Sequence, residues 1–173
     1  MLLSRYLVPF TYYNLILIIL FSLSVSSIES FSIINSISYI FLHFVIIYLG
    51  LYYYRRTLYS IYFLYGLGID ILLINQIGPH LFIFMTLLFF FYLTKKYFIH
   101  LSSQRIFLLI LFIQILIISL EMLLTDFFFD YDFNSDKYLK FVLISIISSY
   151  PIFFIFSKID NLLRIVLLSQ DTL

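Results

Sequence analysis

Long apolar runs separated by short polar stretches are the feature that most constrains how this chain can fold. A helix needs about 20 residues to cross the hydrocarbon of a bilayer, with about 17 as a lower limit, and five of the six runs reach that limit. Backbone groups in lipid must bond internally, which leaves helices or a closed barrel. The runs are Leu7–Val25, Ile33–Leu51, Leu58–Ile74, Pro79–Leu93, Ile106–Leu124 and Tyr138–Phe156.

The composition also indicates a membrane protein. Hydrophobic residues make up 64% of the 173 residues and charged residues 11%, so too little polar surface exists to cover a soluble core. Barrel strands alternate polar and apolar residues, whereas Leu87–Phe91 is apolar throughout. We therefore predict an all-α integral membrane protein, a six-helix transmembrane bundle in which residues 1–173 form a single polytopic domain.

The fourth run is the shortest and needs an extension to cross. We expect Lys95 and Lys96 to snorkel to the headgroups and Tyr97–Ile99 to lengthen the helix. The third and fourth runs are then expected to form a hairpin that crosses fully. A shallow re-entrant hairpin is the alternative.

The basic residues predict the orientation. Lys137 and Lys140 border one side of the membrane, and the other eight of the ten basic residues border the opposite side, which we assign to the cytoplasm. Both termini are therefore expected inside. The eight are Arg5, Arg55, Arg56, Lys95, Lys96, Arg105, Lys158 and Arg164.

The outer side is expected to carry three loops, Ser26–Ser32, Asn75–His80 and Thr125–Asp136. The third mixes acidic with aromatic residues, so we expect it to lie on the outer interface or to dock a partner. The first run is longer than the core of a signal peptide and should remain in the protein. Cleavage after the serine-rich segment Ser22–Ser27 is the alternative.

Asp70 is the clearest ionisable residue at membrane depth, where such a residue is costly and suggests function by default. It lies about 18 Å from the cytoplasmic end of its helix at 1.5 Å per residue. Gly66 lies one turn earlier on the same face, with Gly68 nearby, and glycine lets another helix approach closely. We favour a polar clasp between helices over a proton or ligand site. A clasp should tolerate Asp70→Asn, which keeps the volume and hydrogen bonding.

The segment Asn75–Pro79 is predicted to be a turn. Gly78 tolerates unusual φ, and Pro79 suits the first turn of the next helix.

Three further polar residues lie inside apolar runs. His43 is central in the second run, where a histidine is more often a hydrogen-bonded packing residue than a metal ligand. Glu121 lies one turn from the outer end of the fifth run, and we expect it to reach the outer interface. Gln114 lies seven residues earlier, on a similar face.

No catalytic motif is apparent. Aspartyl intramembrane proteases need two carboxylates that share a proton, and the nearest second aspartate is Asp126, at the outer end of the fifth run. The chain has no Cys, no Gly-x-Ser-x-Gly, no His-Glu-x-x-His and no phosphate-binding glycine loop. The net charge of +1 gives no field for nucleic acid. We therefore expect neither enzymatic activity nor a cofactor or metal.

One stretch resembles a known family. Gly66-x-x-x-Asp70, followed by Gly78 at the start of the next helix, resembles the rod shape-determining protein MreD family. The resemblance is specific over about Tyr65–Lys96 and extends over the whole length in layout. The family often has a second glycine four residues after the aspartate, whereas this chain has Ile74, which leaves the turn geometry open.

The resemblance implies a small protein of the bacterial inner membrane with five or six spans and no enzymatic activity. It implies a scaffold subunit of the cell-elongation complex, which builds lateral peptidoglycan and maintains rod shape. Its implied partners are an MreC-like bitopic protein, an MreB-like filament, and a RodA-like glycosyltransferase with its transpeptidase. Gly66, Asp70 and Gly78 are the implied signature positions.

A transporter subunit is the alternative function. The substrate-binding membrane components of energy-coupling-factor vitamin transporters are also six-span chains of this size. They usually dock their coupling subunit through Ala-x-x-x-Ala in the first span. This chain has no Ala, although Ser22, Ser24 and Ser26 can substitute as small residues.

Overall fold

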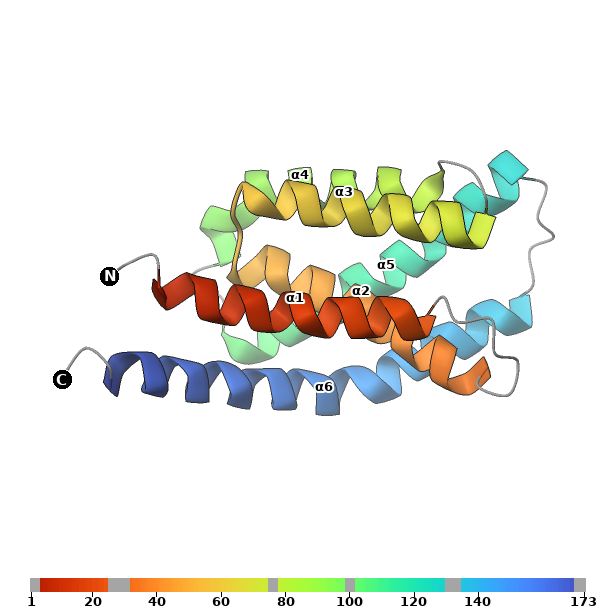
Figure 1. The fold of residues 1–173 in the computed structure, drawn as a ribbon. Helices are drawn as coiled ribbons and strands as arrows, with labels where there is room; N and C mark the ends of the chain where they lie inside the picture. The colour runs from red at the N-terminus through yellow and green to blue at the C-terminus, as the bar shows by residue number, and fades with distance from the viewer. Residues whose placement is uncertain (1–3, 25–31, 75–77, 99–101, 130–134, 170–173) are drawn as a thin grey trace.

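The computed structural model describes residues 4–24, 32–74, 78–98, 102–129 and 135–169, with side chains over most of these ranges. This part of the chain consists of helices and short connections and contains no strand. Each helix overlaps one of the apolar runs (Figure 1). The elements are α1 (Ser4–Ser24), α2 (Ser32–Tyr52), α3 (Thr57–Ile69), the π-helical turn η2 (Asp70–Ile74), α4 (Pro79–Phe98), α5 (Ser103–Phe129) and α6 (Ser135–Ser169).

The helices run up and down the bundle, so that α1 begins and α6 ends at the same end (Figure 1). Neighbours in sequence pack as the pairs α1–α2, α3–α4 and α5–α6. Helix α2 also contacts α4, α5 and α6, which makes it the central helix. It can take this position because the segment 40–50 is apolar on nearly every face, and almost all of its residues are buried.

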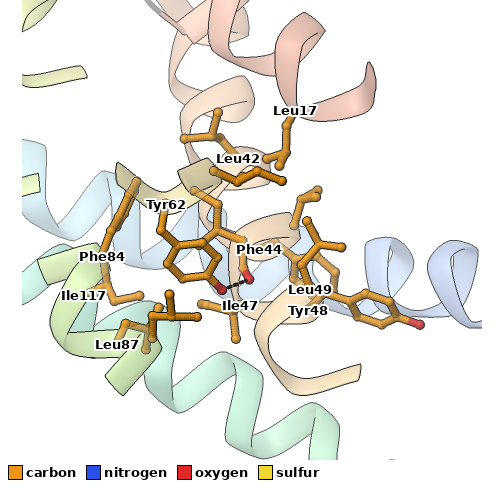
Figure 2. Packing of buried hydrophobic residues seen from close by; sticks show 14 of the residues in the cluster. Leu17, Leu42, Phe44, Ile47, Tyr48, Leu49, Tyr62, Phe84, Leu87 and Ile117 are labelled. Carbon is orange, nitrogen blue, oxygen red and sulfur yellow. Dashed lines mark hydrogen bonds between the residues drawn. The ribbon is translucent and has the colours of Figure 1, made fainter. Parts of the chain in front are cut away.

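The core forms where α2 meets the α3–α4 hairpin (Figure 2). The buried Tyr62 of α3 donates its hydroxyl hydrogen to the carbonyl of Ile46 on α2. Gly50 of α2 makes room for the rings around it, because a Cβ there would lie 2.2 Å from Cδ2 of Phe91 and 2.6 Å from the Tyr62 hydroxyl. Gly50 was not among the residues predicted from the sequence to be important.

The outer surface of the bundle is apolar. Phe82, Leu108 and Ile147 are each more than 60% exposed, and they lie on three different helices. Apolar exposure of this extent is what a lipid-facing surface requires. Among the described residues, three helices are long and apolar enough to cross a membrane, at Ile34–Tyr52, Ser103–Phe128 and Tyr138–Ile159. The structure therefore shows an all-helical protein with membrane-spanning character.

Helix ends differ from prediction at all three outer loops. At the first the difference is one residue, because α2 begins at Ser32. The Thr125–Asp136 loop is wrong in part, because α5 continues to Phe129 and α6 already begins at Ser135. No Gly or Pro follows Leu124 to stop the helix, and the Thr125 hydroxyl donates to the Glu121 carbonyl within it. The predicted loop Asn75–His80 is also too long, since α4 begins at Pro79. Residues 25–31, 75–77 and 130–134 lie outside the described part.

The predicted extension of the fourth helix is confirmed as far as Phe98. Helix α4 runs through Lys96 and Tyr97 to Phe98, and the side chains of Lys96 and Tyr97 are exposed. Ile99 lies outside the described residues. Pro79 is the first residue of α4, where its missing N–H removes no helical hydrogen bond.

Candidate functional site

Asp70 lies where α3 changes to the π-helical turn η2, and its carboxylate meets the beginning of α4. One oxygen, Oδ2, accepts the backbone N–H groups of Gly78 and Leu81, each at 3.0 Å. The other, Oδ1, accepts the backbone N–H of His80 at 3.1 Å and lies 2.7 Å from Nδ1 of its ring. Asp70 thus caps α4 from another helix, as an anion does at a helix N-terminus. The side chain is fully buried.

Gly66 brings the two backbones close enough for this contact. A Cβ at Gly66 would lie 2.7 Å from Cα of Leu81 and 3.3 Å from the carbonyl oxygen of His80. Because both are backbone atoms, the space can be made only by moving α4. Gly68 has a different neighbour, since its Cβ would lie 2.8 Å from the tip of the Phe21 ring on α1.

His80 extends the clasp into a row of hydrogen-bonded side chains. Its Nε2 lies 2.9 Å from the Tyr39 hydroxyl, which in turn lies 2.7 Å from Oε2 of Glu121. The other oxygen of Glu121, Oε1, lies 2.7 Å from Nε2 of His43. We call these five side chains, Asp70, His80, Tyr39, Glu121 and His43, the polar cluster. They come from η2, α4, α2 and α5 and therefore join four parts of the bundle.

Gln114 makes a second polar link, separate from the polar cluster. Its amide nitrogen donates to the carbonyl of Ile40 on α2 at 3.1 Å, and its oxygen accepts from Ser149 of α6 at 3.1 Å. This buried side chain thereby joins three helices. The hydroxyl of Ser145, one turn from Ser149, is buried with no hydrogen-bond partner among the described residues.

The sequence-based interpretation of Glu121 is wrong. Its side chain does not reach the outer interface but is 4% exposed and bonded by Tyr39 and His43. A carboxylate one turn from a helix end can snorkel only if its face points to lipid, and this face points to α2. His43 is a hydrogen-bonded packing residue, as the sequence indicated.

Tyr39 and His80 were missed by the sequence analysis. Tyr39 lies four residues before His43 on the same helix face, and His80 follows the proline that starts α4. Tyrosine is no distinctive signal in a chain with 16 Tyr and 22 Phe, and His80 fell in a segment that was expected to be a loop. The available sequence signals were the spacing of Tyr39 from His43 and the spacing of His80 from Asp70.

The polar cluster is suited to holding helices together and to sharing protons among its side chains. The carboxylates of Asp70 and Glu121 are separated by His80 and Tyr39, so the two acids do not share one proton directly, as aspartic proteases require. Among the described residues, no three His, Cys, Asp or Glu side chains gather as metal ligands do. Removing one partner of a buried charged pair costs about 3–5 kcal/mol, so the pairs Asp70–His80 and Glu121–His43 are expected to matter for assembly.

Comparison with known proteins identifies no relative. Searches of protein-family models, of curated proteins and of solved structures find no significant match to this chain.

Proposed function

We propose that this protein is a non-enzymatic scaffold subunit of the bacterial cell-elongation complex. In this proposal it crosses the inner membrane six times with both termini in the cytoplasm. It acts with an MreC-like bitopic protein, an MreB-like filament, and a RodA-like glycosyltransferase with its transpeptidase. Its role is to help position lateral peptidoglycan synthesis.

The observation that carries the proposal is the clasp at the α3–α4 hairpin. The residues on which the resemblance rests are Gly66, Asp70 and Gly78, which are separated by up to 12 positions in sequence. In the structure they form one unit, in which Gly66 allows close approach and Asp70 binds the Gly78 N–H at 3.0 Å. A shared structural task accounts for that spacing without any catalytic role.

The arrangement of the helix ends supports the topology. Helix α1 begins and α6 ends at one end of the bundle, which fits an even number of crossings (Figure 1). Arg55 and Arg56 connect α2 to α3, while Lys96 and Arg105 flank the connection between α4 and α5. Basic residues at these connections favour the cytoplasm for that end. Helices α1 and α4 have 21 and 20 residues, about 30 Å at 1.5 Å per residue.

Depletion of the protein from its own cells tests this function. We expect rods to become spheres and new peptidoglycan to lose its lateral pattern, measured by cell aspect ratio and by incorporation of a fluorescent D-amino acid. Re-expression of the native protein should restore both, whereas Asp70→Ala should not. Asp126→Ala is the matched control, because it removes a carboxylate from α5 outside the polar cluster. Membrane levels of all three forms are compared by immunoblot.

The same cells distinguish the alternative function. If depleted cells keep their rod shape but lose uptake of a vitamin, the protein is a transporter component and the scaffold proposal fails.

A further inference from the structure

Most of the polar cluster is shielded from its surroundings. Asp70, His80, Glu121 and His43 are each at most 5% exposed, and Tyr39 is half-buried. Aromatic rings pack against it, with Phe84 of α4 at 5.5 Å from the His43 ring and Phe141 of α6 at 5.9 Å from the Tyr39 ring, measured between centroids. The titratable groups that face one another are therefore contributed by α2, η2, α4 and α5. A proton inside this cluster has protein groups as its nearest acceptors.

The geometry fixes how many protons the cluster holds. Nδ1 of His43 lies 2.8 Å from the backbone carbonyl of Tyr39, and because a carbonyl only accepts, Nδ1 carries a hydrogen. The Tyr39 hydroxyl has one hydrogen to share between His80 and Glu121, so the neighbour that does not receive it must donate. Each side-chain contact is satisfied by one hydrogen. An added proton would place two hydrogens between one pair of side chains, and a lost proton would leave one pair with no hydrogen between them.

Several arrangements satisfy this count, and two of them differ in which of His80 and Glu121 holds one proton. In the first, His80 is an imidazolium that donates to Asp70 and to Tyr39, and Tyr39 donates to an ionised Glu121. In the second, Glu121 is protonated and donates to Tyr39, Tyr39 donates to Nε2 of His80, and His80 is neutral. The cluster has zero net charge in both, since His43 remains an imidazolium and Asp70 a carboxylate. In the first arrangement each charge lies beside an opposite charge. In the second, the Asp70 carboxylate still accepts four N–H groups and the His43 imidazolium still donates to two oxygens.

We propose that the polar cluster is an intramembrane proton relay, in which Tyr39 passes a proton between His80 on α4 and Glu121 on α5. The Nε2–H bond of His80 breaks and its proton binds the Tyr39 oxygen, while the original Tyr39 O–H bond breaks and that proton binds Oε2 of Glu121. One N–H bond is exchanged for one O–H bond, and no proton leaves the cluster. The distances of 2.9 and 2.7 Å are those of direct proton donors and acceptors. This inference does not depend on the proposed function.

The relay makes different predictions from a static clasp. In a static clasp, His80 keeps one form at all times, either the imidazolium or the neutral Nδ1–H form. In the relay, its two ring nitrogens report an average of the imidazolium and the neutral Nδ1–H form. Tyr39→Phe removes the oxygen through which the proton passes, so His80 becomes a constant imidazolium. Glu121→Gln removes the group that takes up the proton, so each histidine keeps a single form. If the amide nitrogen faces Nε2 of His43, then His43 is neutral and His80 is an imidazolium; if it faces Tyr39, the two forms are reversed.

The experiment is ¹⁵N NMR of histidine side chains in the full-length protein in lipid nanodiscs. We expect averaged ¹⁵N shifts for His80 in the native protein and imidazolium shifts for His80 in Tyr39→Phe. In Glu121→Gln we expect one of the two histidines, His80 or His43, to be a constant imidazolium and the other to be constantly neutral. Gln114→Leu is the control, because it removes a buried link between α2, α5 and α6 without contacting the polar cluster. It should leave the shifts of both histidines unchanged.

Three results would overturn the relay. One is a His80 shift in the native protein that is wholly that of the imidazolium or wholly that of the neutral form. Another is a His80 shift that Gln114→Leu changes as much as Tyr39→Phe, which would indicate general loosening. The third is a His80 shift that stays averaged in Glu121→Gln. Glu121→Gln retains the shape of the side chain, so it carries the test even if Tyr39→Phe does not fold.

Discussion

Replacement of the Asp70 carboxylate by an amide is expected to destabilise the bundle, although an amide has almost the same volume. Four hydrogen-bond donors point at the two carboxylate oxygens, and an asparagine NH₂ group can accept none of them. The structure therefore revises the sequence-based expectation that Asp70→Asn would preserve the clasp. Asp70 does clasp α4, but the clasp requires a hydrogen-bond acceptor at the position of each carboxylate oxygen.

The magnitude follows from the orientation that costs least. If the amide nitrogen replaces Oδ2, the N–H groups of Gly78 and Leu81 both lose their acceptor. If it replaces Oδ1, a neutral His80 ring can accept from it, and only the His80 backbone N–H is left unpaired. One hydrogen bond to a charged group contributes about 1.5–3 kcal/mol, and an anion at a helix N-terminus up to about 2 kcal/mol. We expect the free energy of unfolding to fall by about 2–5 kcal/mol.

The assay is reversible denaturation of the full-length protein in detergent micelles, followed by tyrosine fluorescence, because the chain has 16 Tyr and no Trp. Asp126→Asn is the control, since Asp126 is a half-buried carboxylate outside the polar cluster. Its free energy of unfolding should change by no more than about 0.5 kcal/mol. If both variants unfold at the same denaturant concentration as the native protein, the carboxylate does not cap α4 as inferred.

Three more outcomes are expected. Gly66→Ala should lower the free energy of unfolding by about 1–3 kcal/mol, which is more than Gly68→Ala should. The Cβ at position 66 meets the backbone of Leu81, whereas the Cβ at position 68 meets a ring that can shift. Equal losses in the same assay would contradict this. Gly50→Ala should cost a similar amount, since Phe91 and Tyr62 must both move, and a variant with native stability would refute the packing around α2. The chain has no Cys, so single cysteines at Arg56, Arg105 and Asp136 report the topology by labelling with an impermeant maleimide. We expect the first two to be labelled only after the membrane is opened and the third in intact spheroplasts, and the reverse pattern would overturn the orientation.

The sequence alone determined which segments form helices and that these helices suit a lipid environment. A run of about 20 apolar residues without a polar face has no stable alternative to a helix in lipid, so composition and run length predicted the six helices and most of their ends. Gly66 and Asp70 were also identifiable, because a glycine and an acid one turn apart are conspicuous inside an apolar run. Local signals were sufficient for these features.

The tertiary structure alone decided which polar groups meet. The position of Glu121 near the end of its run predicted exposure, yet the rotation of α5 about its axis turns the residue toward Tyr39 and His43. Helical rotation is set by the packing of whole faces, and it cannot be determined from runs that are apolar on every side. The partnership of His80 with Asp70 likewise depends on how closely α3 approaches α4, which is a property of the two backbones at Gly66 and Leu81.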